Sequence, residues 1–66
     1  MKIRWRVLGG EWHEHETDAK TVGELMRELS LSSEEYLPSV GGKLVTEDER
    51  IKDGVDITFV PVVSGG

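Results

Sequence analysis

The first residues of the chain alternate between apolar and basic side chains. Ile3, Trp5 and Val7 fall on one side of an extended backbone, and the basic residues between them fall on the other. Strict alternation of this kind predicts a half-buried strand over residues 2–8. A Gly-Gly pair at 9–10 then indicates a turn.

The polar segment 12–18 can pair with this strand in two ways. A two-residue loop would place Glu14 opposite Trp5 on the core side, where burying a charge is costly. A three-residue loop over 9–11 instead places opposite charges across the hairpin. The resulting pairs are Arg6–Glu14, Arg4–Glu16 and Lys2–Asp18. We expect this second register, which puts three residues on the face of Trp5: His13, His15 and Thr17.

A helix is predicted to begin near residue 21. The run Thr21-Val22-Gly23-Glu24 fits a capping box, in which the Thr hydroxyl and the Glu carboxylate each accept a backbone N–H. The apolar face then recurs at i, i+3, i+4 and i+7, and comprises Val22, Leu25, Met26 and Leu29. Gly23 costs something like 1 kcal/mol relative to Ala in a helix, and its missing side chain would allow close packing on the sheet.

The second half of the chain predicts more strands. Residues 37–45 form two short extended pieces around a Gly-Gly turn, and Pro38 belongs at a sheet edge or a strand start because it cannot donate to a ladder. Residues 47–53 predict a charged surface loop. Residues 55–62 are rich in β-branched side chains and predict the longest strand. Its alternation turns Val55, Ile57 and Phe59 toward the core and Thr58, Val60 and Val62 outward. A hairpin, one helix and further strands indicate an α+β layer.

Several motifs resemble those of prokaryotic ubiquitin-like sulfur carriers, which have the β-grasp fold. They are Thr21-Val22-Gly23-Glu24-Leu25 at the helix start, Gly42-Lys43-Leu44-Val45 and Lys52-Asp53-Gly54 at turns, and Phe59-Val60-Pro61-Val62-Val63-Ser64-Gly65-Gly66 at the C-terminus. The family includes the small subunit of molybdopterin synthase, the thiamine-pathway sulfur carrier and the small archaeal modifier proteins. The resemblance implies a mixed sheet of four to five strands with one main helix on one face. We expect a β-grasp domain over residues 1–62 and a flexible tail over 63–66.

The same resemblance implies a function for the tail. An activating enzyme of the ubiquitin-activating type would use ATP to adenylate the carboxylate of Gly66, and sulfur transfer would convert it to a thiocarboxylate. Gly65 and Gly66 suit this because glycine lets the backbone approach closely in a narrow channel. The sulfur would then serve molybdopterin, thiamine or tRNA thiolation, or the carbonyl would pass to a lysine of a target protein. The implied partner-binding residues are Val60, Pro61, Val62, Val63 and Ser64. Possible acceptors of a conjugated copy are Lys2, Lys20, Lys43 and Lys52.

Charge and composition narrow the function classes. The chain has 13 Asp and Glu against 8 Lys and Arg, which argues against nucleic acid and favours a basic partner. It has no cysteine, so it has no disulfide, thiolate metal site or cysteine nucleophile. With no apolar run near the roughly 20 residues of a membrane span, we expect a cytoplasmic protein. A free tail argues for a monomer, and we expect no bound cofactor. The absence of Asn and Gln, with abundant Glu and Lys, is typical of thermophiles.

Two other function classes compete with that of a carrier. One is a β-grasp interaction module that is never activated, and the sequence does not exclude it. The other is an enzyme, which the lack of a nucleophile–base grouping, of a phosphate loop and of room for a pocket argues against. His13 and His15 share a strand face and invite a metal site, but zinc needs three or four ligands. We therefore expect two half-buried histidines packed near Trp5.

Overall fold

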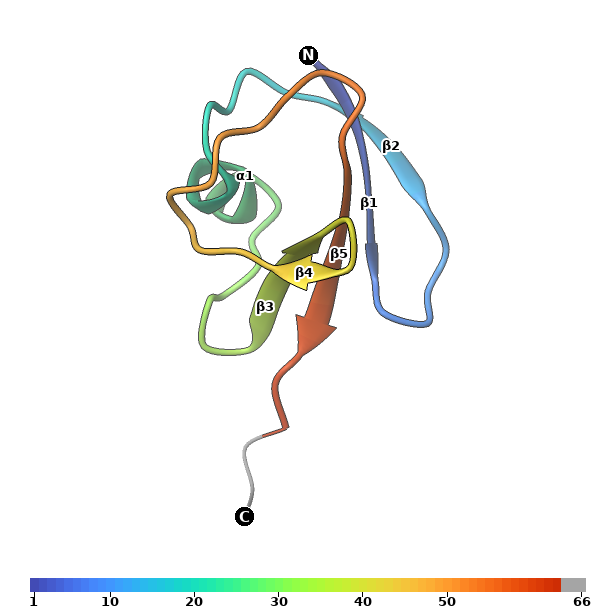
Figure 1. Cartoon of the computed structure of the whole chain (residues 1–66), viewed down its shortest axis with the longest axis vertical. Coiled ribbons are helices and arrows are strands. Elements are labelled where there is room, and N and C mark those ends of the chain that lie inside the picture. The colour runs from blue at the N-terminus through green and yellow to red at the C-terminus, as the bar shows by residue number, and fades with distance from the viewer. Residues whose placement is uncertain (64–66) are drawn as a thin grey trace.

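The computed structural model describes residues 1–63. The elements in chain order are β1 (Lys2–Val7), β2 (His13–Glu16), α1 (Val22–Glu28), β3 (Tyr36–Val40), β4 (Lys43–Leu44) and β5 (Asp56–Pro61). The strands form one sheet in the order β2-β1-β5-β3-β4, in which β1 and β5 are parallel and the other pairs are antiparallel. The single helix α1 covers one face of the sheet, as expected, and the chain leaves the molecule beyond β5 (Figure 1).

The core lies between the sheet and α1. Its buried side chains are Ile3, Ala19, Val22, Leu25, Met26, Ile51, Ile57 and Phe59. The outward and inward residues of β5 alternate as predicted, because Ile57 and Phe59 are fully buried and their neighbours are half-buried. The sequence indicated neither Ala19 nor Ile51 as a core residue. Ile51 lies in the loop that was expected to be on the surface, and it anchors that loop in the core.

The helix begins at the predicted capping box. The Thr21 hydroxyl accepts the Glu24 N–H at 3.3 Å, and the Glu24 carboxylate accepts the Thr21 N–H at 3.2 Å. The loop after β4 supplies the other partners that a helix start needs, since the carbonyl oxygens of Glu49 and Glu47 accept the N–H groups of Val22 and Gly23 at 2.9 Å each. Gly23 therefore packs against this loop, and the expectation that it faces the sheet is wrong.

The helix ends in a left-handed residue. Ser30 has φ 60, and its N–H donates to the Arg27 carbonyl at 3.1 Å. The Leu31 N–H then donates to the Met26 carbonyl at 2.8 Å. This pair of bonds is a Schellman motif, in which glycine is the usual left-handed residue.

The predicted register of the first hairpin is wrong by two residues. Arg4 lies opposite Glu14, and Lys2 lies opposite Glu16. The loop between the strands is longer than the three residues expected, since β1 ends at Val7 and β2 begins at His13. A shift of two preserves the faces. His13 and His15 therefore still lie on the face of Trp5, which confirms that part of the expectation.

Pro38 lies inside the sheet, between β5 and β4, and not at an edge or a strand start. Its carbonyl oxygen accepts the Val45 N–H at 3.0 Å, so its nitrogen also faces the side of β4. There β4 has already ended at Leu44, and the sheet tolerates the missing donor. The helix α1 is too short to cross a membrane, and the rest of residues 1–63 contains no spanning helix.

Candidate functional site

The face of the sheet opposite α1 is open, and it carries the outward residues of every strand. The charged end of this face lies at the start of β1 and β5. There the guanidinium of Arg4 donates to both carboxylate oxygens of Asp56, at 2.8 and 2.7 Å. These hydrogen bonds hold the pKa of Asp56 below its ordinary value and raise the pKa of Arg4. Glu14 flanks Arg4 on the other side. The positive charge of Arg4 is therefore already compensated by carboxylates at this end of the face.

The opposite end of the open face is apolar. Val60 on β5 lies opposite Leu37 on β3. Leu8 extends β1 by one residue, because its N–H donates to the Phe59 carbonyl at 2.9 Å, and this places Leu8 beside Val60. The exposed fractions of Leu8 and Leu37 are 54% and 41%, so neither is covered within residues 1–63.

We call this surface the apolar patch and define it as Leu8, Leu37, Leu44, Val60 and Val62. Leu44 lies on the same face, because it is opposite Ser39, and Ser39 is in turn opposite Thr58. Scattered exposed apolar residues are ordinary, but several gathered on one part of an open sheet face are typical of a protein-binding surface. The alternation in the sequence indicated Val60 and Val62. It did not indicate Leu8 or Leu37, which stand next to a turn and a proline.

The chain leaves the sheet beside the apolar patch. The Val62 N–H donates to the Glu35 carbonyl at 2.8 Å, one step beyond the last strand pair. Val63 follows with an exposed fraction of 88%. Of the predicted partner-binding residues, Val60 and Pro61 lie in β5, and Val62 and Val63 lie just after it. Ser64, Gly65 and Gly66 lie outside the described residues.

Trp12 and Arg6 lie between the charged end and the apolar patch. The Cζ atoms of Arg6 and Arg4 lie 4.7 and 5.1 Å from the centroid of the Trp12 ring, which is a cation–π geometry. Arg6 also donates through Nε to the Thr58 hydroxyl at 3.3 Å. Trp12 keeps an exposed fraction of 39%. The open face thus carries an exposed aromatic ring and an arginine, the residue types enriched at protein interfaces.

The two histidines have separate partners. The His13 ring packs at a tilt against Trp5, with centroids 4.7 Å apart, but His13 is exposed, so the expectation of two half-buried histidines is wrong for it. His15 Nε2 lies 2.8 Å from a carboxylate oxygen of Glu28 on α1, and the buried hydroxyl of Thr17 donates to the same oxygen at 2.7 Å. These bonds, first from Thr17 and then from His15, hold the pKa of Glu28 below its ordinary value. Within residues 1–63, no group of three or more His, Asp or Glu is arranged to hold a metal ion.

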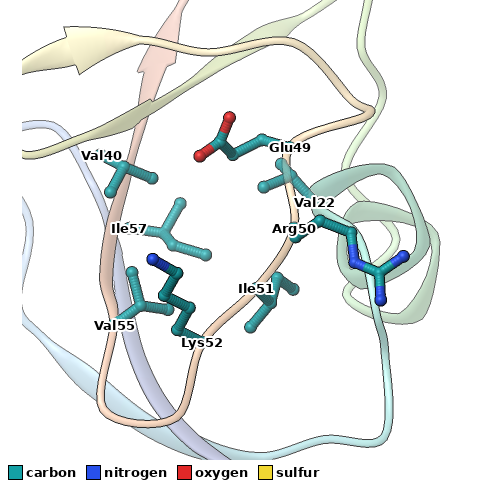
Figure 2. Close-up of a pocket in the computed structure, with 8 residues that line it drawn as sticks. All are labelled: Val22, Val40, Glu49, Arg50, Ile51, Lys52, Val55 and Ile57. Atoms are coloured by element: carbon teal, nitrogen blue, oxygen red, sulfur yellow. The ribbon is translucent and has the colours of Figure 1, made fainter.

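A cavity of about 130 Å³ opens between the 46–55 loop and the sheet. Figure 2 shows its floor of apolar side chains, with the charged side chains of Glu49 and Lys52 beside them. The floor includes Val55 and Ile57, at the start of β5, so the cavity lies at the opposite end of that strand from the tail (Figure 1). A cavity of this size admits a single side chain, and its lining contains no nucleophile paired with a base.

The four candidate acceptor lysines are all exposed and lie on different elements. Lys2 begins β1, Lys20 precedes the helix cap, Lys43 begins β4, and Lys52 borders the cavity. The structure therefore does not bring them together into one site.

Comparison with known proteins identifies a family and a similar solved structure. A family model described as the ThiS family matches residues 5–66. The fold is similar to the crystal structure of SAMP1 from Haloferax volcanii, with a TM-score of 0.73, 18% sequence identity and 100% of each chain covered. At this identity the likeness concerns the fold, and it confirms the expected β-grasp architecture.

Proposed function

The chain belongs to the ThiS family, and on that premise we propose that it is a ubiquitin-like carrier activated at the carboxylate of Gly66. The observation that carries this proposal is the family match, which runs through residue 66 and so includes Gly65 and Gly66. The apolar patch supports it, because a surface for an activating enzyme should adjoin the tail that the enzyme modifies.

The proposed chemistry begins at the tail. An oxygen of the Gly66 carboxylate attacks the α-phosphorus of ATP, and the bond to pyrophosphate breaks. The terminal sulfur of a donor persulfide then attacks the acyl adenylate, and AMP leaves with the electron pair. A second thiol on the donor side cleaves the acyl disulfide, which releases the thiocarboxylate and leaves a disulfide on the donor. In this scheme the protein is the substrate of the activating enzyme, and its own residues dock and present the tail.

The same acyl adenylate has a second possible reaction, in which the protein acts as a protein modifier. A lysine amine of a target attacks the carbonyl, an amide forms, and AMP leaves. Lys2, Lys20, Lys43 and Lys52 are proposed as acceptors when the target is another copy of this protein. The enzymes that bind the activated protein determine which of the two reactions occurs.

The absence of cysteine makes a direct test possible. The protein is purified from its own cells, treated with a thiol alkylator and digested with trypsin. Because Lys52 is the last basic residue, the C-terminal peptide runs from Asp53 to Gly66 and contains no methionine that could oxidise. We expect an alkyl adduct on this peptide, since a thiocarboxylate is the only thiol-like group that it can carry.

The matched control is a variant that lacks Gly65 and Gly66. The last hydrogen bond described, from Val62, is untouched, so its thermal unfolding should match that of the wild type while the adduct disappears. Higher-mass conjugates without an adduct would favour the modifier role. Neither adduct nor conjugates would leave the non-activated interaction module as the better description.

A further inference from the structure

Arg6 is an arginine of the open face whose guanidinium contacts a hydroxyl and an aromatic ring but no carboxylate of residues 1–63. Its Nε donates to the Thr58 hydroxyl at 3.3 Å, and its Cζ lies 4.7 Å from the Trp12 ring centroid. Among residues 1–63, no carboxylate forms an ion pair with it. The residue is half-buried, so part of its hydration has already been given up.

Arg4 provides the internal comparison. It lies two residues earlier on the same strand and contacts the same tryptophan ring at 5.1 Å. Its guanidinium, however, is engaged by both oxygens of Asp56. Arg4 lies opposite Asp56 on β5, whereas Arg6, which is closer to the apolar patch, lies opposite Thr58. A neutral hydroxyl thus takes the place of the carboxylate, and Arg6 keeps most of its five donors available.

The neighbours of Arg6 on the other side are apolar. Leu8 follows it on β1, and Leu8 lies beside Val60 on β5. A partner that covers the apolar patch therefore also covers the guanidinium and removes water from it. A charge buried in this way is costly unless the partner supplies an opposite charge.

We propose that Arg6, braced by Trp12, binds a carboxylate of the protein that docks on the apolar patch. The docking surface of that partner then carries an Asp or Glu side chain next to aliphatic side chains. The proposal rests on the proposed function, in which the partner is the activating enzyme. An arginine fixed by stacking loses little conformational freedom on binding, which suits a bidentate contact to a carboxylate.

The charge of the whole chain gives this contact a role in orientation. The formal net charge of the chain is −5, so long-range attraction favours a partner that is basic overall. A carboxylate within such a basic surface would pair with Arg6, the arginine of the open face that no carboxylate of residues 1–63 engages. Complementary charges of this kind fix the register of docking and exclude wrong partners.

The test is ATP–pyrophosphate exchange by the purified adenylating enzyme of the same cells, measured against the concentration of the full-length protein. The variant is Arg6→Gln, and the matched control is Arg4→Gln. Each removes one guanidinium from Trp12, so an effect of lost stacking would appear in both. We expect the KM for the carrier to rise roughly ten- to hundred-fold for Arg6→Gln and to stay within about two-fold for Arg4→Gln. Arg6→Lys should recover part of the loss, because it keeps the charge but not the fork.

The outcomes separate the two proposals. No exchange with the wild-type protein overturns the proposed function and this inference with it. Exchange with an unchanged KM for Arg6→Gln overturns the inference alone, and so does an equal rise for Arg6→Gln and Arg4→Gln. All assays are run well below the unfolding midpoints of the variants, as measured by circular dichroism. If Arg6→Gln fails to fold, Arg6→Lys decides: a KM equal to that of the wild type at low and high salt would refute a bidentate carboxylate contact.

Discussion

Gly23 offers a prediction in which two effects of similar size oppose each other. The residue lies in the first turn of α1, where replacement by alanine ordinarily favours a helix by about 1 kcal/mol. A Cβ atom at this position would lie 3.0 Å from the Glu47 Cβ and 3.3 Å from the Glu47 carbonyl oxygen. Carbon atoms prefer a separation of about 3.5–4.0 Å, so the loop would have to move away.

The loop is not free to retreat. The Gly23 N–H donates to the Glu47 carbonyl at 2.9 Å, and the Val22 N–H donates to the Glu49 carbonyl at the same distance. Movement away from the new methyl group stretches bonds that satisfy the helix start. Overpacking of this kind typically costs about 1–3 kcal/mol, which outweighs the helix term. We therefore expect Gly23→Ala to destabilise the protein by about 1 kcal/mol, or about 4–8 °C in Tm for a domain of this size.

The assay is thermal and urea unfolding followed by tryptophan fluorescence. A double-mutant cycle with Glu47→Gly removes the Cβ atom that the new methyl group would meet. In that background Gly23→Ala should be neutral or stabilising, which gives a coupling energy of about 1 kcal/mol or more. A rise in Tm for Gly23→Ala alone, or the same effect in both backgrounds, would refute the reasoning.

Two further predictions concern the end of α1 and the contact of β2 with it. Ser30→Gly should stabilise the protein by roughly 0.5–1 kcal/mol, because glycine adopts the left-handed conformation without the usual strain while adding some freedom to the unfolded chain; a lower urea midpoint would contradict this. The pKa of Glu28 is lowered by Thr17 and then by His15, so this contribution to stability is present above the ordinary carboxyl pKa of about 4.3 and is lost as pH falls through the depressed value. Glu28→Gln should therefore have a lower Tm than the wild type at pH 7 and a flatter Tm profile below pH ~4.5; parallel profiles would count against the assignment.

The first hairpin shows which part of a sheet can be predicted from a sequence. Burial of Ile3 fixed the face on which each residue of β1 and β2 lies, because the side-chain period is two. The pairing itself was beyond reach, since Glu14 and Glu16 are equally good partners for Arg4 by charge alone. The observed register also brings Trp12 under Arg4 and Arg6. That gain depends on a longer loop, which no turn motif in the sequence indicates.

The candidate site, too, could be predicted from the sequence only in part. The outward alternation of β5 was enough to predict Val60 as a docking residue. Leu37 belongs to the same patch, but it stands beside Pro38, which made β3 look like an edge. A proline inside the sheet is tolerated because β4 is only two residues long, and strand length is a tertiary outcome. Ile51 was hidden among charged neighbours, where a single apolar residue has no periodicity to reveal it.

The parallel pairing of β1 and β5 has a mechanical consequence. The two strands are central neighbours in the sheet, and they run in the same direction. The chain before β1 and the chain after β5 therefore leave from opposite ends of the pair (Figure 1). Force applied between these ends loads the backbone hydrogen bonds of the pair in shear, so that they share the load instead of opening one at a time. A pull on the chain after β5 while the start of β1 is held would therefore have to break these hydrogen bonds together.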